Sequence, residues 1–187
     1  MKQPKHPVDV PDTGRRLVLL RHAKAEPGKG AVPDADRALA LNGRKQAGRV
    51  GMALTAAGLV PDLTLVSSAL RTRQTWELAR AHLGNHGERQ HLDAEVREEL
   101  YAASIGDVIG LVRCVDPEVR TLLVIGHEPT MAATAAYLAD KSSDDAALAQ
   151  VRVGVPTATF SVLHAVKQPW SEWTKKSATL LRVGRPS

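Results

Sequence analysis

Three polar segments of this 187-residue chain follow short aliphatic runs and carry residue types that bind and transfer phosphoryl groups. Arg21 and His22 follow residues 17–20, Arg71 follows the second run and a pair of serines, and His127 follows the third run. If the runs are parallel strands, their carboxyl ends meet at one edge of a sheet, where helix N-termini point inward. Two imidazoles and two guanidinium groups gathered there would form a positively charged pocket suited to a phosphoryl dianion.

Each residue type has a chemical role in such a pocket. A neutral imidazole can attack phosphorus and hold the group as a phosphoramidate, which divides the transfer into two easier steps. Arginine stays protonated and offers a planar fork of donors to the equatorial oxygens, and a second imidazole can donate to the same oxygens. A carboxylic acid can protonate the leaving group and then activate water.

Taken singly, each cluster also has a structural explanation. A histidine after a strand can be a plain hydrogen-bonding group, Arg71 can form a salt bridge on a helix surface, and His127 can cap a helix. Their coincidence at matching strand ends favours the functional interpretation.

Neither a metal nor a cofactor is expected. Asp34, Asp36 and Glu128 offer carboxylates, but no His-x-x-x-His spacing occurs and the nearby arginines would repel a cation.

The elements that must position these residues alternate between strands and helices, which predicts a layered α/β domain. Residues 84–97 are expected to form a polar loop and 140–145 a polar connection, with a flexible tail over 1–14 and one domain over 15–187. Asn42 is the expected cap of the first helix. The predicted strands cover residues 15–20, 62–66, 121–125, 158–166 and 178–183, and the predicted helices cover 43–57, 70–83, 104–113 and 129–139.

Composition excludes several classes of protein. One cysteine, Cys114, permits no internal disulfide and makes a thiolate zinc site implausible. No apolar run approaches the roughly 18 residues that span a bilayer, and residues 1–13 lack the apolar centre of a signal peptide. The sequence therefore predicts a cytoplasmic protein with no membrane partner.

The net charge of +5 does not indicate a nucleic-acid partner. Basic residues gather near the two ends of the chain, and the charges between them are mixed, so no basic stripe forms. With three Trp, two Tyr and one Phe, the chain also lacks the aromatic side chains of a base-stacking surface.

Together the motifs resemble those of the histidine phosphatase superfamily, also called phosphoglycerate mutase-like. Arg21-His22-Ala23 is similar to the Arg-His-Gly signature of that family, residues 67–75 to its second motif, and residues 126–129 to its third. Residues 36–43 resemble the segment after its first loop, and the resemblance spans residues 17–139 in consistent order. It implies a three-layer α/β sandwich with a central, mostly parallel sheet flanked by helices.

The resemblance also implies roles for the residues of the motifs. His22 would be the nucleophile that accepts the phosphoryl group, and Arg21, Arg71 and His127 would form the phosphate pocket. We also expect Ser68, in the second motif, to contact the substrate. Phosphate or another oxyanion is the expected guest of this pocket.

The general acid of the family lies before the third motif, and residues 97–102 resemble that region. Counting back from Tyr101, Glu98 matches best and Glu99 is the alternative. Either could instead be a solvated surface carboxylate. Phosphohistidine requires less help from an acid than a phosphate ester does, because its P–N bond is labile and imidazole is the leaving group.

Within the superfamily, the short chain and the Arg-His-Ala-Lys start most resemble the SixA-type phosphohistidine phosphatases. Only 26 residues separate Arg71 from Glu98 and 19 separate Tyr101 from Thr121, so no lid domain fits. An open pocket suits a phosphohistidine carried on a protein. A broad phosphomonoesterase for small molecules and a non-catalytic phosphate-binding module are the alternatives, whereas a mutase would need an enclosed site.

Overall fold

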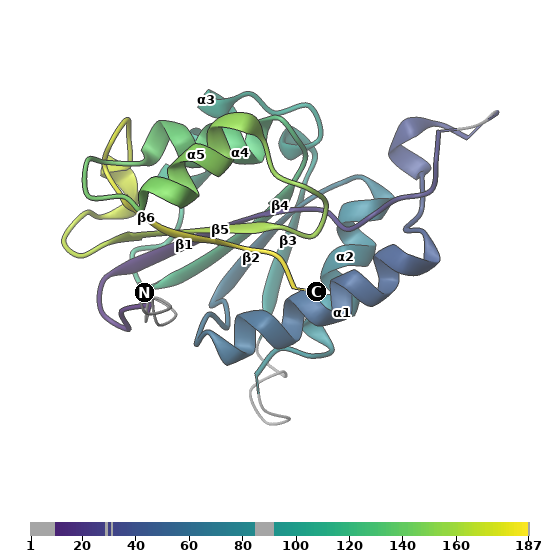
Figure 1. Cartoon of the computed structure of the whole chain (residues 1–187), viewed down its shortest axis with the longest axis horizontal. Coiled ribbons are helices and arrows are strands. Elements are labelled where there is room, and N and C mark those ends of the chain that lie inside the picture. The colour runs from purple at the N-terminus through teal and green to yellow at the C-terminus, as the bar shows by residue number, and fades with distance from the viewer. Residues whose placement is uncertain (1–9, 29, 31, 85–91, 187) are drawn as a thin grey trace, which may run out of the picture.

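Six strands form one sheet in the computed structural model, which describes residues 10–28, 30, 32–84 and 92–186 (Figure 1). Their order across the sheet is β3-β2-β4-β1-β5-β6. β5 is antiparallel to both of its neighbours, and the other pairs are parallel, so the predicted mostly parallel sheet is confirmed. The strands are β1 (Arg15–Arg21), β2 (Leu63–Ser67), β3 (Asp93–Arg97), β4 (Thr121–Gly126), β5 (Phe160–Ala165) and β6 (Thr179–Gly184).

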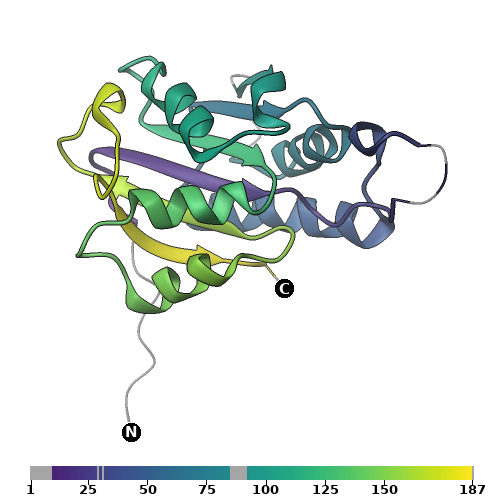
Figure 2. The same cartoon turned by 90° about the horizontal axis from the view of Figure 1, so that it is seen from above.

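Helices cover both faces of this sheet, which confirms the three-layer sandwich (Figures 1 and 2). Successive side chains of a strand point to opposite faces, so in β1 Leu17 and Leu19 face one core while Val18 and Leu20 face the other. The first core packs against α3 (Ile105–Arg113), α4 (Thr130–Leu138) and α5 (Asp145–Val153), and the second against α1 (Leu41–Ala56) and α2 (Leu70–Arg80).

The strand register brings the three motifs to one edge. Arg21, the last residue of β1, pairs with Gly126 at the end of β4. Val66, one residue before the end of β2, pairs with Ile125. The chain therefore leaves three neighbouring parallel strands at the same level, and the segments that follow them converge as predicted.

Two elements were not predicted from the sequence. The stretch expected to be a polar loop, residues 84–97, contains β3, an edge strand whose Glu95 and Val96 side chains are exposed. Charged residues are common on edge strands because they discourage pairing with other chains. The polar connection after residue 140 leads into α5, which Asp144 caps by accepting a hydrogen bond from the amide of Ala147 at 2.9 Å.

The predicted Asn42 cap of α1 is wrong, because the helix begins at Leu41 and Ala40 is the capping residue. The amide of Ala40 donates to the carbonyl oxygen of Lys24 at 2.9 Å, which anchors the start of α1 beside the first motif. A side chain at Gly43 would collide with the same carbonyl oxygen. Close approach of two backbones therefore decides where α1 begins.

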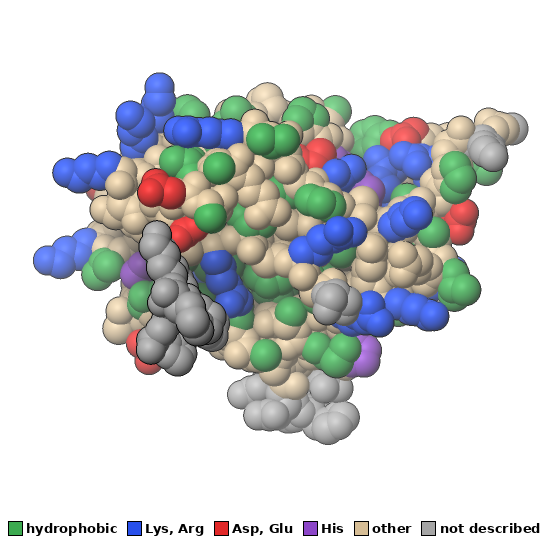
Figure 3. Space-filling model, in the orientation of Figure 1, with side chains coloured by type: hydrophobic (Ala, Val, Ile, Leu, Met, Phe, Trp, Pro, Cys, Tyr) green, Lys and Arg blue, Asp and Glu red, His purple; other side chains and the backbone are tan. Residues whose placement is uncertain are grey.

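Residues 1–9 of the predicted flexible tail lie outside the described residues. In its described part, the carbonyl oxygen of Thr13 accepts a hydrogen bond from Nε2 of His164 at 2.7 Å, and Val10 packs half-buried against the second core. Figure 3 shows Lys and Arg side chains spread over one face of the molecule, with other side chains between them. No described helix is long and apolar enough to cross a membrane.

The start of α3 generates a stability prediction. The Ser104 side chain accepts a hydrogen bond from the amide of Asp107, and the Asp107 carboxylate accepts one from the Ser104 amide at 2.8 Å, which completes a capping box. We expect Ser104→Ala to lower the free energy of unfolding by about 1 kcal/mol in urea denaturation. Ser171→Ala, at an exposed serine in a short 3-10 helix, is the control. Equal losses in the two variants would contradict the assigned cap.

Candidate active site

His22 lies directly after β1, and backbone hydrogen bonds fix its position. Its amide donates to the carbonyl oxygen of Gly126 at 3.1 Å, which extends the pairing of β1 with β4. The amide of Ala158 lies 3.2 Å from the carbonyl oxygen of Arg21 and 3.1 Å from that of His22. Ala158 has a φ of 58°, a conformation that few non-glycine residues adopt. The His22 side chain is therefore held by a rigid backbone.

The tautomer of His22 follows from one contact. Its Nδ1 lies 2.7 Å from the carbonyl oxygen of Ala23. A carbonyl oxygen can only accept, so Nδ1 carries the proton and donates it. In the neutral ring the lone pair is then on Nε2, which is the atom available for attack on an electrophile.

Both site histidines are held neutral. Burial lowers the pKa of the His22 imidazole to about 4, and the nearby charges of Arg71 and Arg21 act in the same direction. Burial also lowers the pKa of His127 to about 3, with further contributions from His22 and Arg71. The two rings are close together, with 5.2 Å between their centroids. At neutral pH the positive charge of the site therefore resides on its arginines.

Arg71, on the first turn of α2, is the most buried of these arginines, with 5% of its surface exposed. Its Nη1 donates to the carbonyl oxygen of Asp34 at 2.7 Å, and its Nη2 donates to the Asp34 carboxylate at 3.0 Å. Asp34 lies in a 3-10 helix, η1 (Asp34–Asp36), and also accepts a hydrogen bond from the hydroxyl of Tyr101 at 2.7 Å. This bond, with those from Arg37 and Arg71, holds the pKa of the Asp34 carboxyl far below its ordinary value.

His127 follows β4 and, besides the His22 ring, contacts three side chains. Its Nε2 lies 2.8 Å from the hydroxyl oxygen of Ser67, and its Nδ1 lies 3.4 Å from Nη2 of Arg71. The ring of Tyr101 meets it edge-on, with 5.7 Å between centroids. Because a guanidinium nitrogen cannot accept, Nδ1 of His127 is the accepting atom and Nε2 carries the proton. His127 thus donates its one N–H, at Nε2, to the hydroxyl oxygen of Ser67.

Arg21 is positioned by a chain of contacts from the third motif. Its Nη1 donates to the carbonyl oxygen of Val155 at 2.7 Å. The amide of Val155 donates to Oε1 of Glu128 at 2.9 Å, and the other oxygen of Glu128 accepts from the amide of Ala132 in α4 at 3.2 Å. One carboxylate therefore connects the helix after β4 to the loop that holds Arg21.

The structure brings most of the predicted pocket residues together. His22, Arg71 and His127 lie together, and Arg21 precedes His22 at the end of β1. Ser68 is half-buried just before α2, and the serine that contacts His127 is Ser67. This serine is the last residue of β2, so its contact with His127 depends on the alternation of side chains along that strand.

The two candidate acids begin the 3-10 helix η3 (Glu98–Leu100), and both are exposed. The Glu99 carboxylate forms an ion pair with Arg97 at 3.2 Å. Within the described part of the chain, no hydrogen bond or ion pair joins Glu98 to His22, Arg71 or His127. Asp34 and Tyr101, by contrast, belong to the site geometry although the sequence did not indicate either as a functional residue. The described residues contain no group of three or more His, Cys, Asp or Glu arranged to hold a metal ion.

Comparison with known proteins identifies the family. Residues 17–114 match the model of the histidine phosphatase superfamily (branch 1). An uncharacterized protein of Mycobacterium tuberculosis is 39% identical over 165 residues, which cover 87% of this chain and 96% of that protein. The chain belongs to the histidine phosphatase superfamily.

Solved structures share the fold over nearly the whole chain. A protein assigned as the phosphohistidine phosphatase SixA of Nakamurella multipartitia has a TM-score of 0.78 and 30% identity, covering 95% of this chain and 99% of its own. The corresponding protein of Agrobacterium tumefaciens has a TM-score of 0.73 and 27% identity, covering 92% and 99%. The fold is thus phosphoglycerate mutase-like and of the SixA type, and the family and these neighbours make the chain a phosphatase.

The lowered pKa values lead to a titration prediction. We expect the Cε1–H resonances of His22 and His127 to stay unshifted between pH 8 and pH 5.5, because both rings remain neutral there. In the unfolded chain both rings take up protons near pH 6.5. The free energy of unfolding should therefore fall as the pH drops from about 6.5 towards 4. NMR titration, with His22→Gln for assignment, checks this, and an inflection near pH 6.5 in either resonance would contradict it.

The role of Glu128 in holding Arg21 is also testable. Glutamine offers one acceptor oxygen in place of two, so Glu128→Gln cannot accept from both Val155 and Ala132. We expect the variant to bind tungstate about tenfold more weakly, as for the loss of one hydrogen bond to a charged group. Calorimetric titration measures this change, and KM should rise more than kcat falls. Glu118→Gln, at an exposed carboxylate near the opposite sheet edge, is the control, and equal affinities in the two variants would overturn the assignment.

Proposed function

We propose that this phosphatase removes the phosphoryl group from phosphohistidine on a protein, without a metal, through a phosphohistidine intermediate on His22. The observation that carries the proposal is the tautomer of His22. A neutral ring whose Nδ1 proton is committed to Ala23 has Nε2 as its free nucleophile. The guanidinium groups of Arg21 and Arg71 supply donors for the oxygens of a phosphoryl group, and the Nε2–H of His127 can turn to such an oxygen in place of the Ser67 hydroxyl.

The reaction has two steps. Nε2 of His22 attacks phosphorus and the P–N bond to the substrate imidazole breaks. The substrate ring carries a proton on its other nitrogen, so it leaves as a neutral imidazole. Water then attacks the phosphorus on His22, the second P–N bond breaks, and inorganic phosphate and neutral His22 are released. The arginines hold the equatorial oxygens, while His127 donates as negative charge shifts among them.

Three findings support this choice of substrate class. The structural neighbours from Nakamurella multipartitia and Agrobacterium tumefaciens are assigned as phosphohistidine phosphatases. A third neighbour, a protein histidine phosphatase SixA, was solved in complex with tungstate, an oxyanion that resembles phosphate. An imidazole leaving group also fits a site whose candidate acid, Glu98, is exposed and outside the network around Arg71.

A substrate panel tests the proposal. We expect His22→Ala to abolish both turnover and the trapping of a phosphoenzyme with every donor. Glu98→Gln should lower kcat/KM less than tenfold on phosphohistidine but about a hundredfold or more on alkyl phosphates, where an alkoxide needs a proton from an acid. The panel contains a histidine-phosphorylated protein and sugar, nucleotide and aryl phosphates, and rates follow from phosphate release.

The outcomes separate the possible activities. Full activity of His22→Ala on phosphohistidine would exclude the proposed mechanism. A higher kcat/KM of the wild type on small phosphate esters than on the phosphoprotein would replace the proposal with a small-molecule phosphomonoesterase. Binding of tungstate without any phosphoenzyme from several donors would replace it with a phosphate-binding module.

A further inference from the structure

α4 and α5 lie on the sheet face opposite α1 and α2 (Figure 1). An apolar groove lies between these two helices. Its volume is about 320 Å³. Ala132, Ala133 and Ala136 of α4 form one wall, and Val151 and Val153 of α5 form the other. We refer to it as the α4–α5 groove.

One end of the α4–α5 groove adjoins the candidate active site. Pro129 and Gly154 line this end. His127 lies two residues before Pro129, and Val155, which follows Gly154, accepts the hydrogen bond from Arg21. Because Glu128 joins the two sides through the amide of Val155, the groove and the position of Arg21 are parts of one rigid arrangement.

The chemistry of the groove indicates what it can bind. Val153 at the end of α5 is 90% exposed, although it stands beside other apolar side chains. A single exposed valine needs no explanation, but an apolar groove next to a catalytic pocket is a typical recognition surface. Arg152 is the one ionisable residue among those that line the groove, all of which are described. Beside the groove, Arg21 and Glu128 carry opposite charges and are both hydrogen-bonded to Val155.

We propose that the α4–α5 groove docks the protein that carries the phosphohistidine, and that it receives an apolar side chain from an amphipathic helix. This inference rests on the proposed function. Helices form both walls and satisfy their own backbone groups, so a partner can offer side chains to the groove but no paired strand. On a helix, a residue four positions from the phosphohistidine lies on the same face, about 6 Å away. An acidic residue of the same helix would pair with Arg152.

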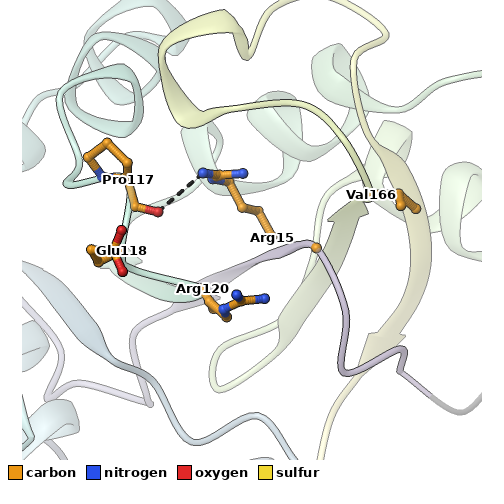
Figure 4. Close-up of a pocket in the computed structure, with 6 residues that line it drawn as sticks. Arg15, Pro117, Glu118, Arg120 and Val166 are labelled. Carbon is orange, nitrogen blue, oxygen red and sulfur yellow. Dashed lines mark hydrogen bonds between the residues drawn. The ribbon is translucent and has the colours of Figure 1, made fainter.

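A second surface pocket lies much farther from His22 than the α4–α5 groove does. It is lined by Arg15, Pro117, Arg120 and Val166, and it carries more charge than the α4–α5 groove (Figure 4). However, it lies at the amino ends of β1 and β4. β1 has seven residues, so its two ends are about 20 Å apart. A side chain bound in that pocket therefore lies about 20 Å from the strand end that carries His22, whereas one bound in the α4–α5 groove lies beside that end.

Peptide substrates test the proposal directly. One designed helical peptide carries phosphohistidine, leucine four residues later and glutamate at the next position on the same face, and a matched peptide has serine in place of leucine. We expect Val153→Asp to lower kcat/KM about tenfold on the leucine peptide, the effect of losing one apolar contact. Free phosphohistidine should be hydrolysed at the wild-type rate, which also shows that the variant is folded. Arg152→Glu should likewise slow hydrolysis of the leucine peptide.

Val166→Asp is the matched control, because Val166 is 62% exposed and lies in the pocket of Figure 4. Val166→Asp should leave all rates unchanged. The wild type should hydrolyse the serine peptide more slowly than the leucine peptide, and this difference should disappear in Val153→Asp. Equal kcat/KM of Val153→Asp and wild type on the leucine peptide would overturn the docking proposal alone. A wild type that hydrolyses neither peptide nor free phosphohistidine would overturn the proposed function as well. Loss of a dimer in Val153→Asp without any change on the peptides would assign the groove to a second copy of the chain and overturn the proposal.

Discussion

The hydrogen bond from the His22 ring to the carbonyl oxygen of Ala23 is the interaction on which the chemistry of the site depends. It decides which ring nitrogen keeps a lone pair, and burial keeps that ring uncharged. The bond is useful only because β4 and the turn at Ala158 fix the backbone on either side of His22. The placement of His22 therefore depends on the sheet register and the local backbone conformation, and its tautomer depends on the hydrogen bond to Ala23.

The sheet edge that carries the site could be predicted, because aliphatic runs and the residues after them are local features of the sequence. The same holds for His22, Arg71 and His127, each of which directly follows or closely follows a buried strand. Asp34 could not be found in this way, since its partners Arg71 and Tyr101 are 37 and 67 residues away in the chain. Only the folded arrangement of η1, α2 and the segment after η3 brings them together.

The missed elements have a related explanation. β3 is polar because it lies at the edge of the sheet, so it lacks the continuous apolar pattern of the central strands. α5 buries only Ala147 and Val151, so little of it belongs to the apolar interior, although Asp144 was a usable capping signal. Sequence patterns therefore identified the buried central strands and their helices better than the edge strand β3 and the peripheral helix α5. α5, which the sequence did not predict, nevertheless forms one wall of the α4–α5 groove.

The contact between Asp34 and Arg71 has a consequence for the departure of the product. The Asp34 carboxylate, 54% exposed, accepts one hydrogen bond from the Arg71 fork, and the backbone carbonyl oxygen of Asp34 accepts another. Inorganic phosphate left in the pocket competes with a tethered carboxylate whose effective concentration is always high. The binding free energy that phosphate gains from Arg71 is therefore the difference between the phosphate–Arg71 and Asp34–Arg71 interactions, which is less than the full energy of one ion pair. If the proposed function holds, this internal competitor would weaken the binding of the phosphate product and so limit product inhibition.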